Sequence, residues 1–269
     1  IFWDNWHFDK VFEDNQKMQL NGREIQYNMI KCTYDQITNE EDRPIEDRTM
    51  SKSLFIIVFH NGNINYILDQ NSNAQKLLRK LLSYTGKNEI QKNSFNFSND
   101  FFVWLISKVY NSDNIIESSN KYLSALQLES IKGFRGDTED SQTRVSATGE
   151  TVMNIISSLS FLLESGRLNQ IKLELSYAGH ENISLILKKE TVSIDFKPYQ
   201  GAFEQEEKDS IIAKLYLLVY LEILPIIDQE YQSNLADKIW NKEAYINFMN
   251  KVGKNLTEKI DIKIKSLNE

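Results

Sequence analysis

The most constraining feature of this sequence lies between residues 170 and 197, where apolar side chains occupy every second position. Three runs share this pattern: Ile171, Leu173, Leu175 and Tyr177, then Ile183, Leu185 and Leu187, then Val192, Ile194 and Phe196. A period of two is typical of a β-strand with one buried face, and connections this short join antiparallel neighbours. The segment therefore predicts a three-stranded antiparallel meander.

A second β unit is predicted nearer the N-terminus. The runs Ser53–His60 and Ile64–Leu68 are rich in β-forming residues, and the turn between them contains Asn61-Gly62. An Asn-Gly pair supplies the positive φ angles of a tight turn, so the two runs predict a hairpin over residues 53–68. The alternating stretch from Glu24 to Tyr34 predicts another half-buried strand.

Apolar residues at helical spacing predict the helices. The expected helices span 74–83 (ended by Gly86), a segment capped by Ser98-Asn99-Asp100, 148–165, 206–228 and 234–267, and Phe95 with Phe97 predicts a short strand. The helix over 148–165 carries the apolar stripe Val152, Ile155, Ile156, Leu159, Leu162 and Leu163. These elements predict an α+β fold, with antiparallel hairpin and meander units packed against helices and a long C-terminal helix.

The length of 269 residues allows one large domain or two small ones. The polar stretch 111–120 marks the expected boundary. It gives an N-terminal α+β subdomain over 1–118, with the hairpin and two helices, and a C-terminal α+β subdomain over 119–269. The second would contain the helix 148–165, the meander and two long helices, of which 206–228 is expected to be buried against the meander.

Charge and cysteine content narrow the class of protein. The net charge is −7, and the Lys and Arg residues form no basic run, which disfavours nucleic acid as a partner. Cys32 is the only cysteine, so no intrachain disulfide can form, and it is interpreted as a small buried hydrophobic residue. We therefore expect a protein of the cytoplasm.

No transmembrane segment is expected. The longest apolar stretch, Ile211–Ile227, is interrupted by Lys214, Glu222 and Pro225, so it predicts a buried helix rather than a bilayer span. The visible N-terminus, IFWDNWHFDK, contains acids and no apolar run, so it does not resemble a signal peptide.

The polar segment from Lys132 to Thr148 is the expected ligand loop. It contains two glycines and charges of both signs, and it precedes a predicted helix. The N–H groups at a helix start favour anions, so the predicted anion ligands are Arg135, Arg144, Ser146 and Thr148. The alternative is a plain surface loop in which a Ser or Thr caps the helix.

Two further sets of acids are weaker candidates. Asp137, Glu139 and Asp140 offer oxygen ligands for Mg²⁺, although acids this close together are common in loops without a metal. Glu181, Asp195 and Lys197 would form a nuclease-like catalytic group, because Asp195 and Lys197 share a face if the strand continues. The alternative is an outward polar face. No cofactor is predicted, and only the enzyme hypothesis would require Mg²⁺.

Aromatic residues are concentrated at the N-terminus. Five of the first twelve residues are Phe or Trp, and Phe2, Trp3, Trp6 and Phe8 are the predicted partner-binding residues. They pack either on the protein's own body or on a partner, as does the long C-terminal helix.

The leading hypothesis is a non-catalytic binding or regulatory subunit of a bacterial or mobile-element complex, with a protein partner or homo-oligomer. The alternative is a metal-dependent enzyme acting on nucleic acid or nucleotides.

Overall fold

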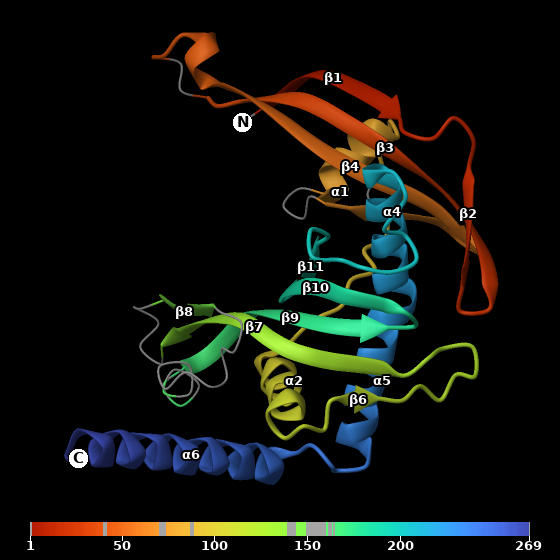
Figure 1. Ribbon diagram of the computed structural model, residues 1–269. Coiled ribbons are helices and arrows are strands. Elements are labelled where there is room, and N and C mark those ends of the chain that lie inside the picture. Colours follow the sequence, from red (N-terminus) through yellow and green to blue (C-terminus); the bar gives the residue numbers. More distant parts are fainter. Residues whose placement is uncertain are drawn as a thin grey trace. The chain divides into compact units, whose positions relative to one another are not determined.

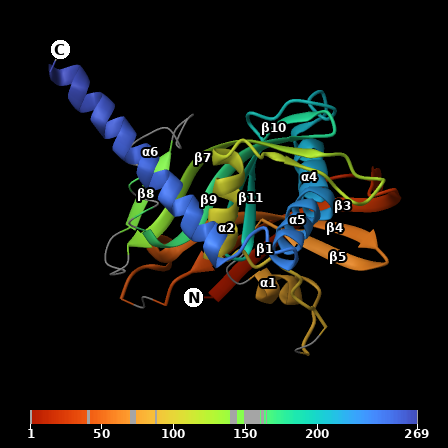
Figure 2. The same ribbon diagram turned by 90° about the horizontal axis from the view of Figure 1, so that it is seen from below.

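The computed structural model of the chain describes residues 2–268 apart from 40–41, 70–73, 87–88, 139–143, 149–159, 161–162 and 164. Two antiparallel sheets and their helices form an α+β fold (Figure 1 and Figure 2), as the sequence predicts. The chain forms two compact units. Unit 1 contains Ile1–Asn93 and Glu206–Leu218, and unit 2 contains Ser94–Gln205 and Val219–Glu269. The boundary expected after residue 118 falls within unit 2.

Unit 1 is built on a five-stranded antiparallel sheet in the order β1-β3-β4-β5, with β2 paired to the first part of β3. Its strands are β1 (Phe2–Lys10), β2 (Gln16–Leu20), β3 (Arg23–Ile37), β4 (Thr49–Asn61) and β5 (Asn63–Leu68). Its helices are the 3₁₀-helix η1 (Ile45–Arg48), α1 (Ala74–Leu81) and α4 (Lys208–Leu218). The strand predicted over 24–34 is thus confirmed as part of β3.

The central strands of unit 1 are apolar on both faces. Along β4, Leu54 and Ile56 point to one face and Ile57 and Phe59 to the other, and all four side chains are buried. A strand that is buried on both faces needs a layer of structure on each side of the sheet. The sheet of unit 1 therefore needs a covering layer on each of its two faces.

The helix α4 covers one of these faces. The ring of Tyr216 meets Phe55 edge-on with centroids 5.2 Å apart. The Lys31 ammonium lies 2.6 Å from the Asp209 carboxylate. The sequence predicted that the helix containing α4 presses on the meander, but residues 208–218 belong to unit 1 instead. The reason is that β3 and β4 have a second apolar face, on which this helix packs.

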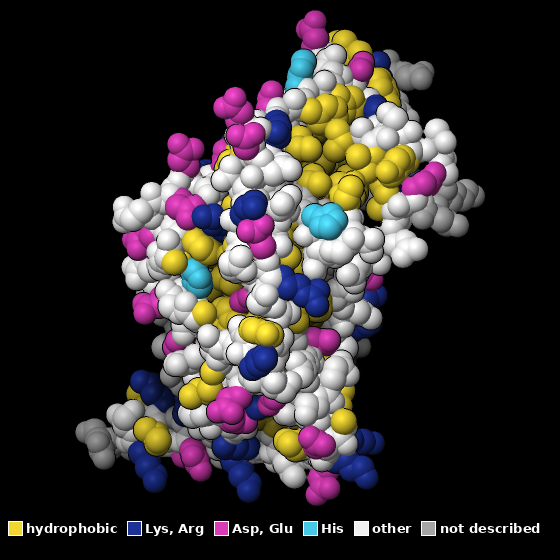
Figure 3. Space-filling view, turned by 90° about the vertical axis from the view of Figure 1, so that its right-hand side faces the viewer, with side chains coloured by type: hydrophobic (Ala, Val, Ile, Leu, Met, Phe, Trp, Pro, Cys, Tyr) yellow, Lys and Arg dark blue, Asp and Glu magenta, His cyan; other side chains and the backbone are white. Residues whose placement is uncertain are grey.

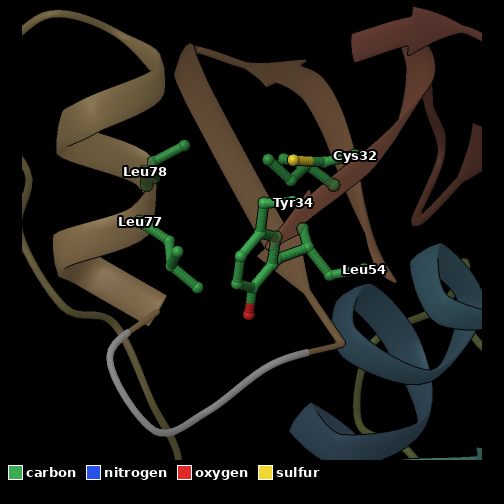
Figure 4. Packing of buried hydrophobic residues seen from close by; sticks show 6 residues of the cluster. Cys32, Tyr34, Leu54, Leu77 and Leu78 are labelled. Carbon is green, nitrogen blue, oxygen red and sulfur yellow. The ribbon is translucent and has the colours of Figure 1, made fainter. Parts of the chain in front are cut away.

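The helix α1 packs on the opposite face, which we call the α1 face. Figure 4 shows Leu77 and Leu78 of α1 on the side of the strands that carries Cys32, Tyr34 and Leu54. Cys32 is 1% exposed, so its interpretation as a buried hydrophobic residue is confirmed. Burial also raises the pKa of the Cys32 thiol to about 11, because the thiolate is disfavoured away from water.

The predicted hairpin is confirmed, and its turn is local in origin. Asn61 pairs with Asn63 across Gly62, whose φ is +76°. That angle suits glycine, and a tight turn requires it.

The end of α1 differs from the prediction, because Ser83 rather than Gly86 turns the chain. Ser83 has a φ of 54°, and the Tyr84 N–H donates to the Arg79 carbonyl over 2.9 Å.

Unit 2 contains a six-stranded antiparallel sheet in the order β11-β10-β9-β7-β6, with β8 paired to β7. Its strands are β6 (Ile115–Ile116), β7 (Leu126–Thr138), β8 (Arg144–Thr148), β9 (Ser165–Tyr177), β10 (His180–Lys188) and β11 (Thr191–Asp195). Its helices are α2 (Asn99–Tyr110), the π-helical segment η3 (Val219–Ile223), α5 (Leu224–Ala236) and α6 (Lys242–Asn268). The meander is confirmed as β9, β10 and β11.

The helix α2 begins where its caps predict. The Ser98 side chain accepts a hydrogen bond from the Phe101 N–H over 3.0 Å. The short strand expected at Phe95 and Phe97 is wrong, since both residues lie in irregular backbone. Their rings stack 5.9 Å apart and the Phe97 N–H bonds to the Lys189 carbonyl, so aromatic packing holds a segment that lacks a strand neighbour.

The segment predicted as a polar ligand loop, Lys132–Thr148, is a β-ribbon in its described parts. It includes the end of β7 and all of β8, and Gly133 pairs with Thr148. The strand β7 also shifts register against β9 at four places, two of them next to Gly133 and Gly136. Such bulges break the alternation that identifies a strand from sequence, which is why the segment resembles a loop.

The helix predicted over 148–165 falls largely outside the described residues. Of its apolar stripe, only Leu163 belongs to the described part of the chain. Its predicted limits overlap strands at both ends, because β8 includes Thr148 and β9 begins at Ser165.

One helical stretch among the described residues, Lys208–Ala236, is long and apolar enough to cross a membrane by length and composition. However, 67% of its most apolar window is buried inside the protein, so the predicted buried core helix is confirmed. The polar residues within it have protein partners. Lys214 pairs with Glu206, and the Glu222 carboxylate accepts a 2.8 Å hydrogen bond from the Tyr177 hydroxyl. Pro225 stands in the first turn of α5, where a proline is tolerated.

Candidate partner-binding surface

The α1 face of the unit 1 sheet continues well past α1. Strand register places three rows of side chains beyond the Cys32 row: Ile30, Ile56 and Leu68, then Asn28, Val58 and Tyr66, then Gln26, His60 and Ile64. Of these, Ile30, Val58, Tyr66 and Leu68 are half-buried, and Ile64 is 63% exposed. Val58, Tyr66 and Leu68 pack against the same core as Leu82 and Ile90, which follow α1. Ile64 is therefore the apolar side chain of these rows that is mostly exposed.

The edge strand β1 adds aromatic rings to the same face. Trp6 stacks on Tyr34 with centroids 4.6 Å apart and on Phe8 with centroids 5.8 Å apart. Trp3 meets both Trp6 and Tyr34 edge-on, at 6.2 Å each. Phe8 ends this pile and is 42% exposed. Three of the four predicted partner-binding residues, Trp3, Trp6 and Phe8, thus lie on the α1 face.

The fourth predicted residue, Phe2, lies on the other face of the sheet. It pairs with Ile37 and precedes Trp3, and successive residues of a strand point to opposite faces. The two alternatives for the N-terminal aromatic residues, packing on the protein's own body or on a partner, therefore apply to different residues. Trp3 and Trp6 pack against the unit's own core, whereas Phe2 and Phe8 remain 48% and 42% exposed.

Lysine side chains lie along the aromatic edge. The Lys76 ammonium lies 4.6 Å from the centre of the Trp3 ring, and that of Lys80 lies 4.8 Å from the Trp6 ring. Lys80 also donates to the Trp3 carbonyl over 3.1 Å, so the end of α1 is tied to β1. Cations over ring faces contribute about 0.5–1 kcal/mol at exposed sites. The Trp6 Nε1 atom is buried without a hydrogen-bond partner, so ring contacts and the Lys80 cation hold this side chain.

The apolar side chains of this face that keep part of their area in water form one surface. We define the α1-side surface as Phe8, Ile30, Val58, Ile64, Tyr66 and Leu68, with Trp3 and Trp6 at its aromatic edge. Figure 3 shows hydrophobic side chains gathered into one area over the strands of unit 1. A continuous exposed apolar area is typical of a surface that another chain covers.

The predicted anion ligands lie along the ribbon of β7 and β8. Register places Arg135 opposite Ser146 and Asp137 opposite Arg144, and Thr148 is the last residue of β8. The Arg135 side chain is exposed. The side chains of Asp137 and of residues 144–148 lie outside what the structure describes. The anion site therefore stays a prediction, without the loop geometry on which it was based.

The predicted metal ligands Glu139 and Asp140, and the side chain of Asp137, also lie outside the described residues. Within the part of the chain that the structure describes, no three His, Cys, Asp or Glu side chains gather closely enough to hold a metal ion.

The nuclease-like group is not assembled as the sequence predicted. The strand β11 ends at Asp195, so Lys197 does not share a strand face with it. Asp195 instead pairs with Lys172, with 3.3 Å between Oδ2 and Nζ, and its Oδ1 accepts the Lys197 N–H. Glu181 is exposed and forms a backbone bridge with Gln200. The acid expected to hold a metal is therefore occupied by an ion pair.

Sequence reasoning missed the aliphatic half of the α1-side surface. The signal was present in Leu54-Phe55-Ile56-Ile57-Val58-Phe59, a run with no polar position that requires cover on both faces. Comparison with protein families, with curated proteins and with solved structures finds no match for this chain. The functional argument therefore rests on the surface itself.

Proposed function

We propose that this protein is a non-catalytic binding subunit that holds a protein partner on the α1-side surface of unit 1. One observation carries the proposal: the sheet of unit 1 is apolar on both faces, and although α1, Leu82 and Ile90 pack on one of them, Phe8 and Ile64 of that face remain 42% and 63% exposed. A partner laid on the remainder would complete the second layer. We also propose that the protein is cytoplasmic, where reducing conditions would keep the buried Cys32 as a thiol.

Burial of this surface would contribute part of the free energy of binding. Taking a Val, Leu, Ile or Phe side chain from full exposure to full burial contributes about 1.5–3 kcal/mol. Six hydrophobic side chains of this surface keep part of their area in water, and Phe8 and Ile64 keep the most. Their combined burial amounts to several kcal/mol before the cost of association is subtracted.

Affinity capture with matched variants tests the proposal. The purified protein is cross-linked in an extract of its own host, and captured proteins are identified by mass spectrometry and then reconstituted as purified pairs. We expect a partner that binds the wild type and Ile115→Glu, a variant at an exposed position of β6 in unit 2 (57% exposed), but not Ile64→Glu or Phe8→Ser. A partner that binds all four proteins equally would contradict the assignment of the surface.

A further inference from the structure

The strand β5 forms one edge of the unit 1 sheet, because it pairs with β4 and, among the described residues, with no second strand. Just past its end, the Asp69 N–H donates to the Phe55 carbonyl over 3.4 Å. Positions that bond to the neighbouring strand alternate in an antiparallel pair, so the odd-numbered residues of β5 bond inward to β4. The backbone N–H and C=O groups of Ile64, Tyr66 and Leu68 therefore point outward from the edge.

These outward groups have no hydrogen-bond partner within the described part of the chain. They comprise three N–H and three C=O groups, and none of the described hydrogen bonds reaches them. The segment after α1 packs on the α1 face through Leu82 and Ile90, but its hydrogen bonds run to α1 and not to β5. An unpaired row of backbone groups is a template on which another strand can form.

The opposite edge of this sheet is protected against such pairing. It is formed by β1 and β2, which contain two aspartates and two lysines. A register shift around Asn5, whose φ is 50°, also breaks the regularity of β1. Charged side chains and bulges are the usual devices that keep an edge strand from pairing with another chain. The strand β5, with the sequence NINYIL, has no charged residue, no proline and no register shift.

The strand β5 is also complementary to itself. When two copies run antiparallel about Tyr66, the outward groups of Tyr66 face those of the second Tyr66, and the outward groups of Ile64 face those of Leu68. This register satisfies all six groups in each copy. It also places the Ile64 side chain, which is 63% exposed, opposite the Leu68 side chain of the second copy. No charged residue lies opposite a like charge in this register.

We infer that two copies of this chain pair antiparallel through β5 and join their five-stranded sheets into one continuous sheet. A second copy offers the same free edge, the same neutral side chains and the register that satisfies every outward group. The pairing occupies the edge in both copies, so association stops at a twofold dimer. One strand pair is a small interface, and we expect dissociation in the micromolar range. The inference goes beyond the proposed function, because it concerns the edge of the sheet and not its α1 face.

Sedimentation equilibrium of the intact protein tests the dimer. Ile64→Pro removes an outward N–H that β4 does not use, so the fold should persist while the dissociation constant rises at least tenfold. Phe8→Ser, on the opposite edge strand, should leave the dimer unchanged even if it loses the partner of the proposed function. Circular dichroism checks that each variant is folded. A wild type that stays monomeric up to submillimolar concentration, or a dimer that Ile64→Pro leaves intact, would overturn the inference.

Cysteine cross-linking tests the register independently of the proline variant. Facing Cα atoms of a hydrogen-bonded antiparallel pair lie about 5.5 Å apart, within reach of a disulfide. Tyr66→Cys should therefore link two copies under mild oxidation at least tenfold faster than Ile64→Cys, whose counterpart lies about 14 Å away along the second strand. Cys32 is 1% exposed and should not compete. Equal rates would exclude this register. A monomeric protein that loses a captured partner in Ile64→Pro would mean that a foreign strand, not a second copy, occupies the edge.

Discussion

The two sheets of this protein use the same antiparallel design but treat their second faces differently. In unit 2 the strands alternate, so Leu173 and Leu185 face the core while Lys172 and Glu174 form the other face. That polar face is neutralised by the pairs Lys132–Glu174 (2.8 Å) and Lys172–Asp195 (3.3 Å). In unit 1 the second face is apolar and only partly covered. A sheet with a polar second face is complete alone, whereas one with two apolar faces is not.

The largest effect should come from the covered core of unit 2. Leu185→Ala removes a side chain that is fully buried, which we expect to cost about 2–5 kcal/mol of the free energy of unfolding. Val58→Ala, on the partly covered face of unit 1, should cost less than half as much because the side chain is smaller and its site already contacts water. Urea unfolding followed by circular dichroism measures both. Equal losses would show that the two faces do not differ in cover.

A smaller effect is expected from acid, and it should be confined to unit 2. Burial lowers the pKa of His180 below its ordinary value of 6.5, because imidazolium is disfavoured there. Its Nδ1 lies 2.7 Å from the Tyr199 hydroxyl. The unfolded chain binds a proton first as the pH falls, so stability is complete above about pH 6.5 and declines below it. Unfolding midpoints from pH 8 to 5 should show this decline in the wild type and a weaker one in His180→Gln.

The polar face of unit 2 should tolerate the loss of an ion pair. In the pair Lys172–Asp195 both side chains are about one third exposed, so Lys172→Ala should cost about 0.2–1 kcal/mol, and less at high salt. Thermal unfolding at two salt concentrations measures it. A loss of several kcal/mol would mean that this face is part of a buried polar core, and the contrast with unit 1 would weaken.

The smallest effect on stability should come from the α1-side surface itself. Ile64 is 63% exposed, so Ile64→Glu should change the free energy of unfolding by about 0.5 kcal/mol or less. The same change should reduce the fluorescence of a dye that binds exposed apolar surface. A variant that unfolds instead would identify Ile64 as core, and unit 1 would need no partner to complete it.

Local features were predictable from sequence, and distant ones were not. The Asn61-Gly62 hairpin and the Ser98 cap depend on residues a few positions apart, so their patterns suffice. The second half of β7, from Lys132 onward, was hidden by its bulges. That α4 belongs to unit 1 depends on contacts such as Lys31 with Asp209, separated by 178 positions, which no periodicity encodes.

The sequence also could not predict which residues of the α1-side surface point inward and which stay exposed. The aromatic residues of β1 were recognisable as a candidate, because Trp and Phe are rarely so concentrated at a chain's end. Which of them point inward follows from pairing with β3 and from a register shift between Asp4 and His7. How far the rows of Ile30 and Val58 are covered depends on the length of α1, which Ser83 ends, and on Leu82 and Ile90 after it.

The membership of α4 in unit 1 has a consequence for synthesis on the ribosome. The strands of the first sheet emerge early, but the helix that covers their second apolar face is encoded only after residues 94–205, all of which belong to unit 2. At a translation rate of 5–20 residues per second, this delay lasts about 6–22 s. During that interval the nascent sheet exposes Ile57 and Phe59. The newborn chain should therefore depend on a holding chaperone more strongly than the finished protein does.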